Sequence, residues 1–155
     1  MRVSVKTNDK LMPFDDAPGG SETVLVVDDD PLVLVLCRRL LAQYNYDVLT
    51  ADDGEEALEM CRGSHKPIHL ALVDVVLPGI SGLEMVRKLE TVQPEIRVVL
   101  MSGYGASQIE EWCETDLTNY GIVWKPFEPK SLLRIIRNAL DTPVRGSMQK
   151  GASAV

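Results

Sequence analysis

Polar residues that could bind a ligand or take part in a reaction follow several apolar runs of this sequence. Asp28 and Asp29 come directly after the run VLVV, and Asp74 follows the run LALV. Ser102 and Lys125 follow two later apolar runs in the same way. Carboxylates in a buried setting repel one another unless a cation compensates them, and Mg²⁺ suits such a set because it combines a few carboxylates with water and phosphate oxygens. The pattern therefore predicts a magnesium site.

The lysine and the hydroxyl complement this acidic group. Lys125 offers an ammonium charge and Ser102 a hydroxyl, and both can hold phosphate oxygens. A phosphoryl group is thus expected to lie between the metal and Lys125. Two histidines, His65 and His69, are interpreted as surface residues without a role as ligands.

Short β-rich runs alternate with longer runs of helical period, which predicts repeated β-α units around a parallel sheet. Four of the five expected strands are dense in Val, Leu and Ile, as strands buried on both faces are. The least apolar is the one at Asp47. The five expected strands are Thr23–Val27, Asp47–Thr50, Ile68–Val73, Arg97–Met101 and Gly121–Trp124.

Capping residues and apolar period predict five helices between and after these strands. Asp30 and Pro31 supply an N-cap and a proline at the first helical position. The helix that they open has a broad apolar face that includes Leu36, Leu40 and Leu41, which predicts that it is largely buried. The five expected helices run from Asp30 to about Tyr44, from Asp52 or Asp53 to about Gly63, from Ser81 or Gly82 to before Pro94, from Ser107 onward, and from Glu128 to about Asp141.

An open α/β sheet binds ligands beyond the carboxyl ends of its strands, where the strand order reverses. The acids, Ser102 and Lys125 are all expected at the carboxyl ends of these strands. The acidic first turn after Asp52, in contrast, is explained by the stabilisation of a helix N-terminus and needs no function.

Four segments, in this order, resemble the receiver domain of two-component response regulators: VLVVDDDP, ALVDVVLPGISG, VVLMSGY and VWKPF. The resemblance covers residues 22 to 141. It implies a flavodoxin-like doubly wound five-stranded parallel sheet with strand order 2-1-3-4-5 and five helices. It also implies Asp74 as the phosphorylated nucleophile, and Asp28, Asp29, Asp74 and the backbone carbonyl of Val76 as Mg²⁺ ligands.

The remaining site residues follow from the same resemblance. Ser102 matches the hydroxyl that contacts the acquired phosphoryl group, and Lys125 the lysine that pairs with it. Pro126 resembles the cis-proline after that lysine. Ile122 stands where receivers commonly carry an aromatic switch residue, which puts that part of the switch in doubt. Val76 and Tyr104 flank the expected phosphoryl group, and their bulk against an attacking water suggests a long-lived phosphoaspartate.

The resemblance implies phosphorelay signalling in which a sensor histidine kinase, a histidine phosphotransfer protein or acetyl phosphate donates the group and the domain changes shape. Beyond phosphorylation from a donor and slow autodephosphorylation, no enzyme activity is expected. A homodimer through helix four, strand five and helix five is a further expectation. The segments SGY, WKPF and GGSETVLVVDDD look most like receivers of hybrid histidine kinases. A free-standing regulator and a relay receiver are the alternatives.

Two other classes of function stay open at the level of the sequence. One is a receiver used only as a binding scaffold, against which the complete set of acids, hydroxyl and lysine argues. The other is a Mg²⁺-dependent phosphatase with an aspartate nucleophile. That class requires a further acid two residues after the nucleophile, where this chain has Val76.

Composition limits the remaining possibilities. The 155 residues fit one domain, expected over 22–142 with flexible tails at 1–21 and 143–155. The net charge of −7 disfavours nucleic-acid binding. Three separated cysteines predict neither a disulfide framework nor a zinc site, and no apolar run approaches the roughly 18 residues of a membrane span. A cytoplasmic protein without membrane or DNA contacts is expected.

Overall fold

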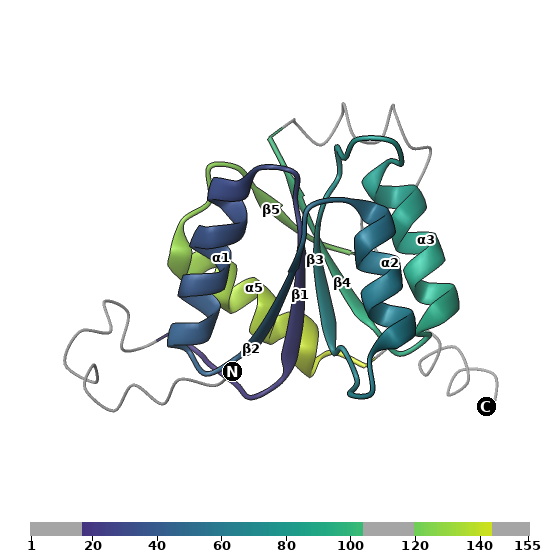
Figure 1. Cartoon of the computed structure of the whole chain (residues 1–155). Helices are drawn as coiled ribbons and strands as arrows, with labels where there is room; N and C mark the ends of the chain where they lie inside the picture. The colour runs from purple at the N-terminus through teal and green to yellow at the C-terminus, as the bar shows by residue number, and fades with distance from the viewer. Residues whose placement is uncertain (1–16, 104–119, 144–155) are drawn as a thin grey trace, which may run out of the picture.

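Five parallel strands form a single sheet with the order β2-β1-β3-β4-β5 in the computed structural model, which describes residues 17–103 and 120–143 (Figure 1). This confirms the predicted strand order. The strands are β1 Thr23–Val27, β2 Asp47–Ala51, β3 Leu70–Asp74, β4 Arg97–Ser102 and β5 Gly121–Trp124. Strand β3 starts two residues later than predicted, although the backbone of His69 still bonds to Thr23 and Arg97 on the neighbouring strands.

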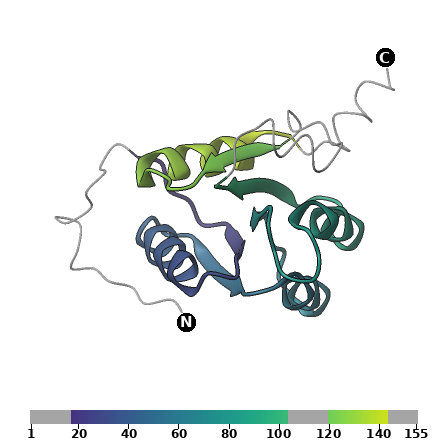
Figure 2. The same cartoon turned by 90° about the horizontal axis from the view of Figure 1, so that it is seen from above.

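Helices cover both faces of this sheet. The described residues contain α1 Pro31–Gln43, α2 Gly54–Gly63, α3 Gly82–Val92 and α5 Pro129–Asp141. Helices α1 and α5 lie on one face, and α2 and α3 on the other (Figure 2). The helix predicted to start at Ser107 lies outside the described residues. None of the helices in residues 17–103 and 120–143 is long and apolar enough to cross a membrane.

The central strands separate two hydrophobic clusters. In β3, Leu70 and Leu72 pack with residues of α1 and α5, whereas Ala71 and Val73 pack with residues of α2 and α3. All four side chains are fully buried, as expected where successive residues of a strand point to opposite, covered faces. The edge strand β2 is more exposed, in agreement with its weaker apolar pattern.

Helix α1 differs from its prediction. Its N-terminus is as expected, since the Asp30 side chain accepts a hydrogen bond from the Leu32 backbone N–H at 2.9 Å. Only Cys37 and Leu41 are buried, however, and Leu36 is 51% exposed. The prediction of a largely buried helix was therefore wrong. The helix lies on one face of the sheet, and its second apolar stripe, which includes Leu32, faces outward.

An ion-pair network joins the start of β1 to α5. Arg137 Nη2 lies 2.6 Å from Glu22 Oε2 and 2.8 Å from Asp141 Oδ1. Arg137 Nη1 also donates to the backbone carbonyl of Gly19. The hydrogen bond from Arg137 is the main reason why the pKa of Glu22 is lowered to about 2. The guanidinium thus ties the segment before β1 to the last helix.

Replacing Glu22 by Gln is expected to lower the free energy of unfolding at pH 7 by about 1 kcal/mol, the upper range for partly exposed ion pairs. Because folding lowers the pKa of Glu22 from 4.5 to about 2, its contribution is complete above pH 4.5 and declines as the pH falls toward 2. Urea denaturation of both proteins at several pH values measures the difference. A difference that stayed constant down to pH 2 would contradict this account.

Candidate functional site

The carboxyl ends of β1, β3, β4 and β5 bring the predicted site residues together. Strand β1 pairs with β3, β3 with β4, and β4 with β5, all in parallel. Asp28 directly follows β1, while Asp74 and Ser102 are the last residues of β3 and β4. These three polar residues are buried, with 0%, 7% and 1% of their surface exposed. Buried polar groups at one edge of a sheet indicate a site built by the fold.

Three carboxylates at this edge could hold a cation. Asp28, Asp29 and Asp74 each offer an oxygen, and these atoms lie within 4.8 Å of one another. Asp29 is exposed, so the group opens to solvent on one side. Carboxylate oxygens with room for water are the ligands that Mg²⁺ accepts. The residues present therefore fit a magnesium ion.

Lys125 bridges two of these acids. Its Nζ lies 2.6 Å from Asp28 Oδ2 and 2.8 Å from Asp74 Oδ2. Burial raises the pKa of Asp28, an effect that the hydrogen bond from Lys125 reduces but does not cancel. Burial alone would lower the pKa of Lys125, but the bonds to Asp28 and Asp74 outweigh it and raise the pKa. The ammonium group thus supplies positive charge where two buried carboxylates meet.

The carboxylate of Asp74 is held at both oxygens. Oδ1 accepts a hydrogen bond from the backbone N–H of Val76 at 2.9 Å, and Oδ2 accepts the bond from Lys125. The Val76 residue itself is 40% exposed beside the acid. Two hydrogen bonds thus fix the orientation of a largely buried carboxylate.

A glycine at the start of α3 allows the loop after β3 to fold back on the site. The N–H of Gly82 donates to the carbonyl of Val75 at 2.9 Å. A Cβ atom at position 82 would collide with the backbone carbonyl oxygen of Asp74 and lie 2.7 Å from Val75 Cα. The sequence pattern predicts Gly82 only as a possible helix start. Nothing in its pattern shows such a close backbone approach.

Replacing Gly82 by Ala is expected to lower the free energy of unfolding by about 2 kcal/mol or more, because backbone rather than a flexible side chain must move. Gly63 is the matched control, since nothing lies within 4 Å of a Cβ added there. The free energy of unfolding of the Gly63→Ala variant should be higher by roughly 0.5 kcal/mol, because Ala has the higher helix propensity. Thermal or urea denaturation compares the two variants, and equal effects at both glycines would refute the close-approach argument.

The remaining predicted site residues are Ser102, Pro126, Ile122 and Tyr104. The backbone carbonyl of Ser102 accepts a hydrogen bond from the Lys125 N–H at 2.8 Å, which joins the ends of β4 and β5. The Lys125–Pro126 peptide bond is cis, as the resemblance implied. Ile122 is half-buried and packs against the core cluster of α2 and α3. Tyr104 lies outside the described residues.

A second group of acids, Asp52, Asp53 and Glu56, also has carboxylate oxygens within 4.8 Å of one another, but helix capping explains this group. The side chain of Asp53 accepts a hydrogen bond from the Glu56 N–H, and the Asp52 N–H donates to the Glu56 carboxylate. These bonds form a reciprocal cap at the start of α2. They bear out the structural interpretation of this acidic turn.

Known proteins show the same organisation. The family model of the response regulator receiver domain matches residues 24–137. The transcriptional regulatory protein AruR of Pseudomonas aeruginosa is 34% identical over 120 residues, 76% of this chain and 48% of that protein. The sensor kinase CckA of Brucella abortus is 31% identical over 122 residues, 79% of this chain and 13% of that kinase. The chain thus spans less than half the length of both curated relatives.

Solved structures agree with the sequence matches. A CheY-like receiver domain from Methanospirillum hungatei has a TM-score of 0.68 at 26% identity, covering 79% of this chain and 95% of that one. The receiver domain of the hybrid histidine kinase CckA has a TM-score of 0.65 at 29% identity, covering 77% and 99%. The chain belongs to the response regulator receiver domain family of two-component signalling.

Proposed function

We propose that Asp74 accepts a phosphoryl group in a Mg²⁺-dependent reaction and that the domain transmits this event through a change of conformation. The observation that carries the proposal is the geometry of Asp74. Its carboxylate is oriented by Val76 and Lys125 and lies close to the buried Asp28 and the exposed Asp29. A structure described as the BeF3-activated receiver domain of DrrB is 28% identical to this chain, which supports the assignment.

The chemistry is a transfer between two nucleophiles. A carboxylate oxygen of Asp74 forms a bond to phosphorus while the bond from phosphorus to the donor breaks. The donor is a phosphohistidine nitrogen of a sensor histidine kinase or a phosphotransfer protein, or an oxygen of acetyl phosphate. The donor leaves with the bonding electron pair. A histidine nitrogen then takes a proton from solvent, whereas acetate leaves as the anion. The protein mainly positions the group and neutralises charge on its oxygens.

Asp28, Asp29 and Asp74 would hold the Mg²⁺, together with the backbone carbonyl of Val76. The bound cation would neutralise charge on the phosphoryl oxygens. Lys125 already contacts Asp74 and would exchange part of this contact for a phosphoryl oxygen. The Ser102 hydroxyl would bind another oxygen, so that the end of β4 responds to phosphorylation. Ile122 would not provide an aromatic read-out at its position on β5.

One experiment tests this function. The protein is incubated with acetyl phosphate or beryllofluoride, with Mg²⁺ or with EDTA, and examined by intact mass and by NMR spectroscopy. A phosphoryl adduct and spectral changes that require Mg²⁺ are expected. Because Val76 and Tyr104 are proposed to hinder an attacking water, the adduct should persist well beyond seconds after the donor is removed. The absence of any adduct would contradict this function and favour a receiver that acts only as a binding scaffold.

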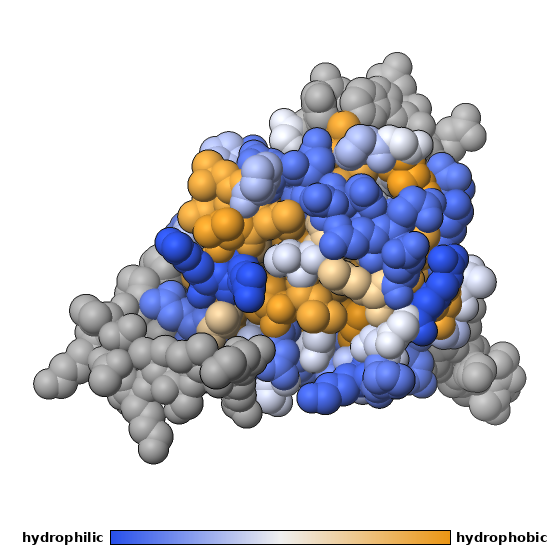
Figure 3. Space-filling model, in the orientation of Figure 1, coloured by the Kyte–Doolittle hydropathy of each residue, from blue (hydrophilic) through white to orange (hydrophobic). Residues whose placement is uncertain are grey.

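The exposed stripe of α1 supports docking of the donor protein beside the site. Leu32, Val35 and Leu36 are 63%, 44% and 51% exposed. They lie within the first two turns of α1, directly after the Asp28–Asp30 segment, and Figure 3 shows hydrophobic surface over α1. Such an apolar patch indicates an interaction surface. We propose that a helical donor covers this stripe while its phosphohistidine reaches Asp74.

Replacing Leu36 by Glu is expected to slow phosphotransfer from a histidine-containing donor roughly tenfold or more, because a charge would be buried at the interface. Phosphorylation by acetyl phosphate should be unchanged, since a small donor needs no docking surface. Parallel rate measurements with both donors separate the two effects. Equal slowing with acetyl phosphate would show that the substitution disturbs the phosphoacceptor site itself. Unchanged rates with both donors would show that the stripe does not contact the donor protein.

Two proposals concern assembly and context. Trp124 on β5 is 42% exposed, which supports a homodimer through β5, α5 and the region predicted as helix four. Size-exclusion chromatography with and without beryllofluoride tests it, and a monomer in both conditions would reject it. The similarity to the sensor kinase CckA supports a place in a hybrid-kinase phosphorelay as an alternative to a free-standing regulator.

A further inference from the structure

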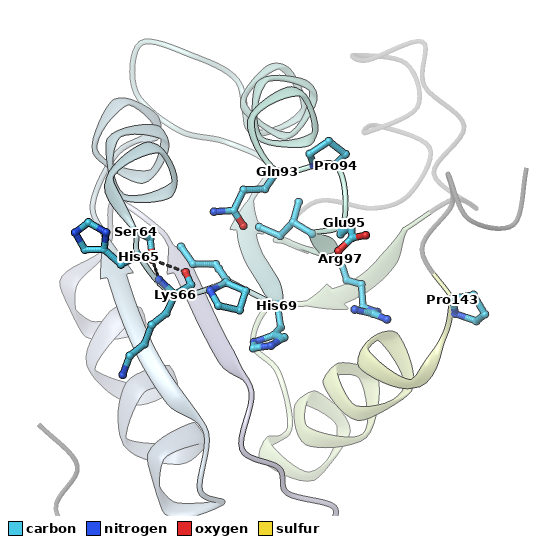
Figure 4. Close-up of a pocket in the computed structure, with 12 residues that line it drawn as sticks. Ser64, His65, Lys66, His69, Gln93, Pro94, Glu95, Arg97 and Pro143 are labelled. Atoms are coloured by element: carbon cyan, nitrogen blue, oxygen red, sulfur yellow. Dashed lines mark hydrogen bonds between the residues drawn. The ribbon is translucent and has the colours of Figure 1, made fainter. Parts of the chain in front are cut away.

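A groove lies at the edge of the sheet opposite the proposed phosphoacceptor. It has a volume of about 790 Å³, within the usual range for small-molecule sites. The loop before β3, the loop before β4 and Pro143 after α5 form its walls (Figure 4). Its floor includes Ile68 and Ile96, which are buried. The groove therefore combines an apolar floor with polar walls.

Arg97 contributes a positive charge to this groove. Its Nε donates to the carbonyl of Thr142 at 3.0 Å, which anchors the guanidinium. Within residues 17–103 and 120–143, no carboxylate pairs with its two terminal amino groups. Arg137, by contrast, binds both Glu22 and Asp141. A half-buried guanidinium whose two terminal amino groups bind no described carboxylate can form a bidentate pair with an oxyanion.

His69 adds a donor next to this arginine. The backbone N–H of Arg97 donates to the carbonyl of His69, the residue just before β3, so His69 lies beside the start of β4. The His69 Nδ1 accepts a hydrogen bond from the Thr23 N–H at 2.9 Å, and the ring therefore carries its hydrogen on Nε2 when neutral. The side chains of His69 and Arg97 extend toward the same side of the groove in Figure 4.

Further positive charge comes from the loop before β3. Lys66 lines the groove, and its backbone is fixed by hydrogen bonds in both directions with Ser64. Among the described residues that line the groove, Glu95 is the single acidic one. The groove is thus locally basic in a chain with a net charge of −7. Prolines at 67, 94 and 143 restrict the backbone of its rim.

We propose that this groove is a second ligand site, which binds a small phosphate-bearing anion through Arg97, His69 and Lys66. The guanidinium of Arg97 and the imidazole N–H of His69 can donate to two oxygens of one phosphate group, and the exposed ammonium group of Lys66 adds positive charge at the rim. The apolar floor accommodates the body of an organic phosphate. The site is separate from the phosphoacceptor, because β3 runs from Leu70 at the groove to Asp74 at the opposite edge.

Inorganic pyrophosphate in EDTA is the probe, because chelation removes the metal that the phosphoacceptor would need. The full chain is titrated and followed by backbone amide NMR. Shifts are expected around Lys66, His69 and Arg97. Replacing Arg97 by Gln should weaken binding roughly tenfold, the usual scale for one lost charge-assisted hydrogen bond. Lys66→Gln, on an exposed residue, should weaken it several-fold without affecting folding.

Arg62→Gln is the matched control, since this exposed residue of α2 carries the same charge but does not line the groove. It should bind the probe like the unmodified chain. Equal weakening by Arg62→Gln would show that net charge alone attracts the anion and would overturn the proposal. Shifts confined to Asp28, Asp74 and Lys125 would assign the binding to the phosphoacceptor instead. The absence of any shift at millimolar pyrophosphate would also reject the site.

Discussion

Replacing Asp74 by Asn is expected to abolish phosphoryl incorporation from acetyl phosphate in Mg²⁺ buffer. The amide keeps the shape of the carboxylate but removes the nucleophile and the negative charge that a cation requires. Intact mass spectrometry should show an adduct for the unmodified chain and none for the variant. Because the amide oxygen can still accept the hydrogen bond from Val76 or Lys125, the fold should be retained.

Asp52→Asn provides the control for this prediction. Asp52 belongs to the second acidic group, which is explained by helix capping, and its carboxylate is exposed. This variant should incorporate the phosphoryl group at the normal rate. An adduct that persisted in the Asp74 variant and mapped to another residue would disprove the assignment of the acceptor, even if phosphorylation itself were real.

The strand ends could be predicted from the sequence because their signals are local and strong. Runs such as VLVV and LALV are buried on both faces, and polar residues that interrupt them have to lie at an edge. The parallel order then brings Asp28 and Asp74 to one edge. The predicted third and fourth strands differ from β3 and β4 by no more than two residues at either end.

Other features depended on contacts that no local pattern contains. The apolar period of α1 did not reveal that Leu32, Val35 and Leu36 are exposed rather than packed against another described element. Such coverage depends on how many helices share one face of the sheet. The sequence also showed that Lys125 follows β5, but not that its Nζ contacts Asp28 and Asp74 together, because a long flexible side chain can reach several partners.

This double contact suggests how the site is kept stable without a metal. Asp28 is fully buried and Asp74 is nearly so, and their carboxylates lie close together. Lys125 compensates them by occupying Oδ2 of both acids. A cation that binds the same cluster would take over part of this compensation. Lys125 and a bound Mg²⁺ would therefore neutralise the same two carboxylates, and removal of either cation should increase the contribution of the other to stability.

Replacing Lys125 by Ala is consequently expected to lower the free energy of unfolding by about 2 to 3 kcal/mol in EDTA, because two buried carboxylates lose their cation. Saturating Mg²⁺ should recover much of this loss, so Mg²⁺ should stabilise the variant more than the unmodified chain. Urea denaturation in EDTA and in Mg²⁺ measures both increments. Lys88→Ala, on an exposed lysine of α3, should show neither effect. If Mg²⁺ stabilised the unmodified chain and the Lys125 variant equally, then lysine and metal would not share the same carboxylates.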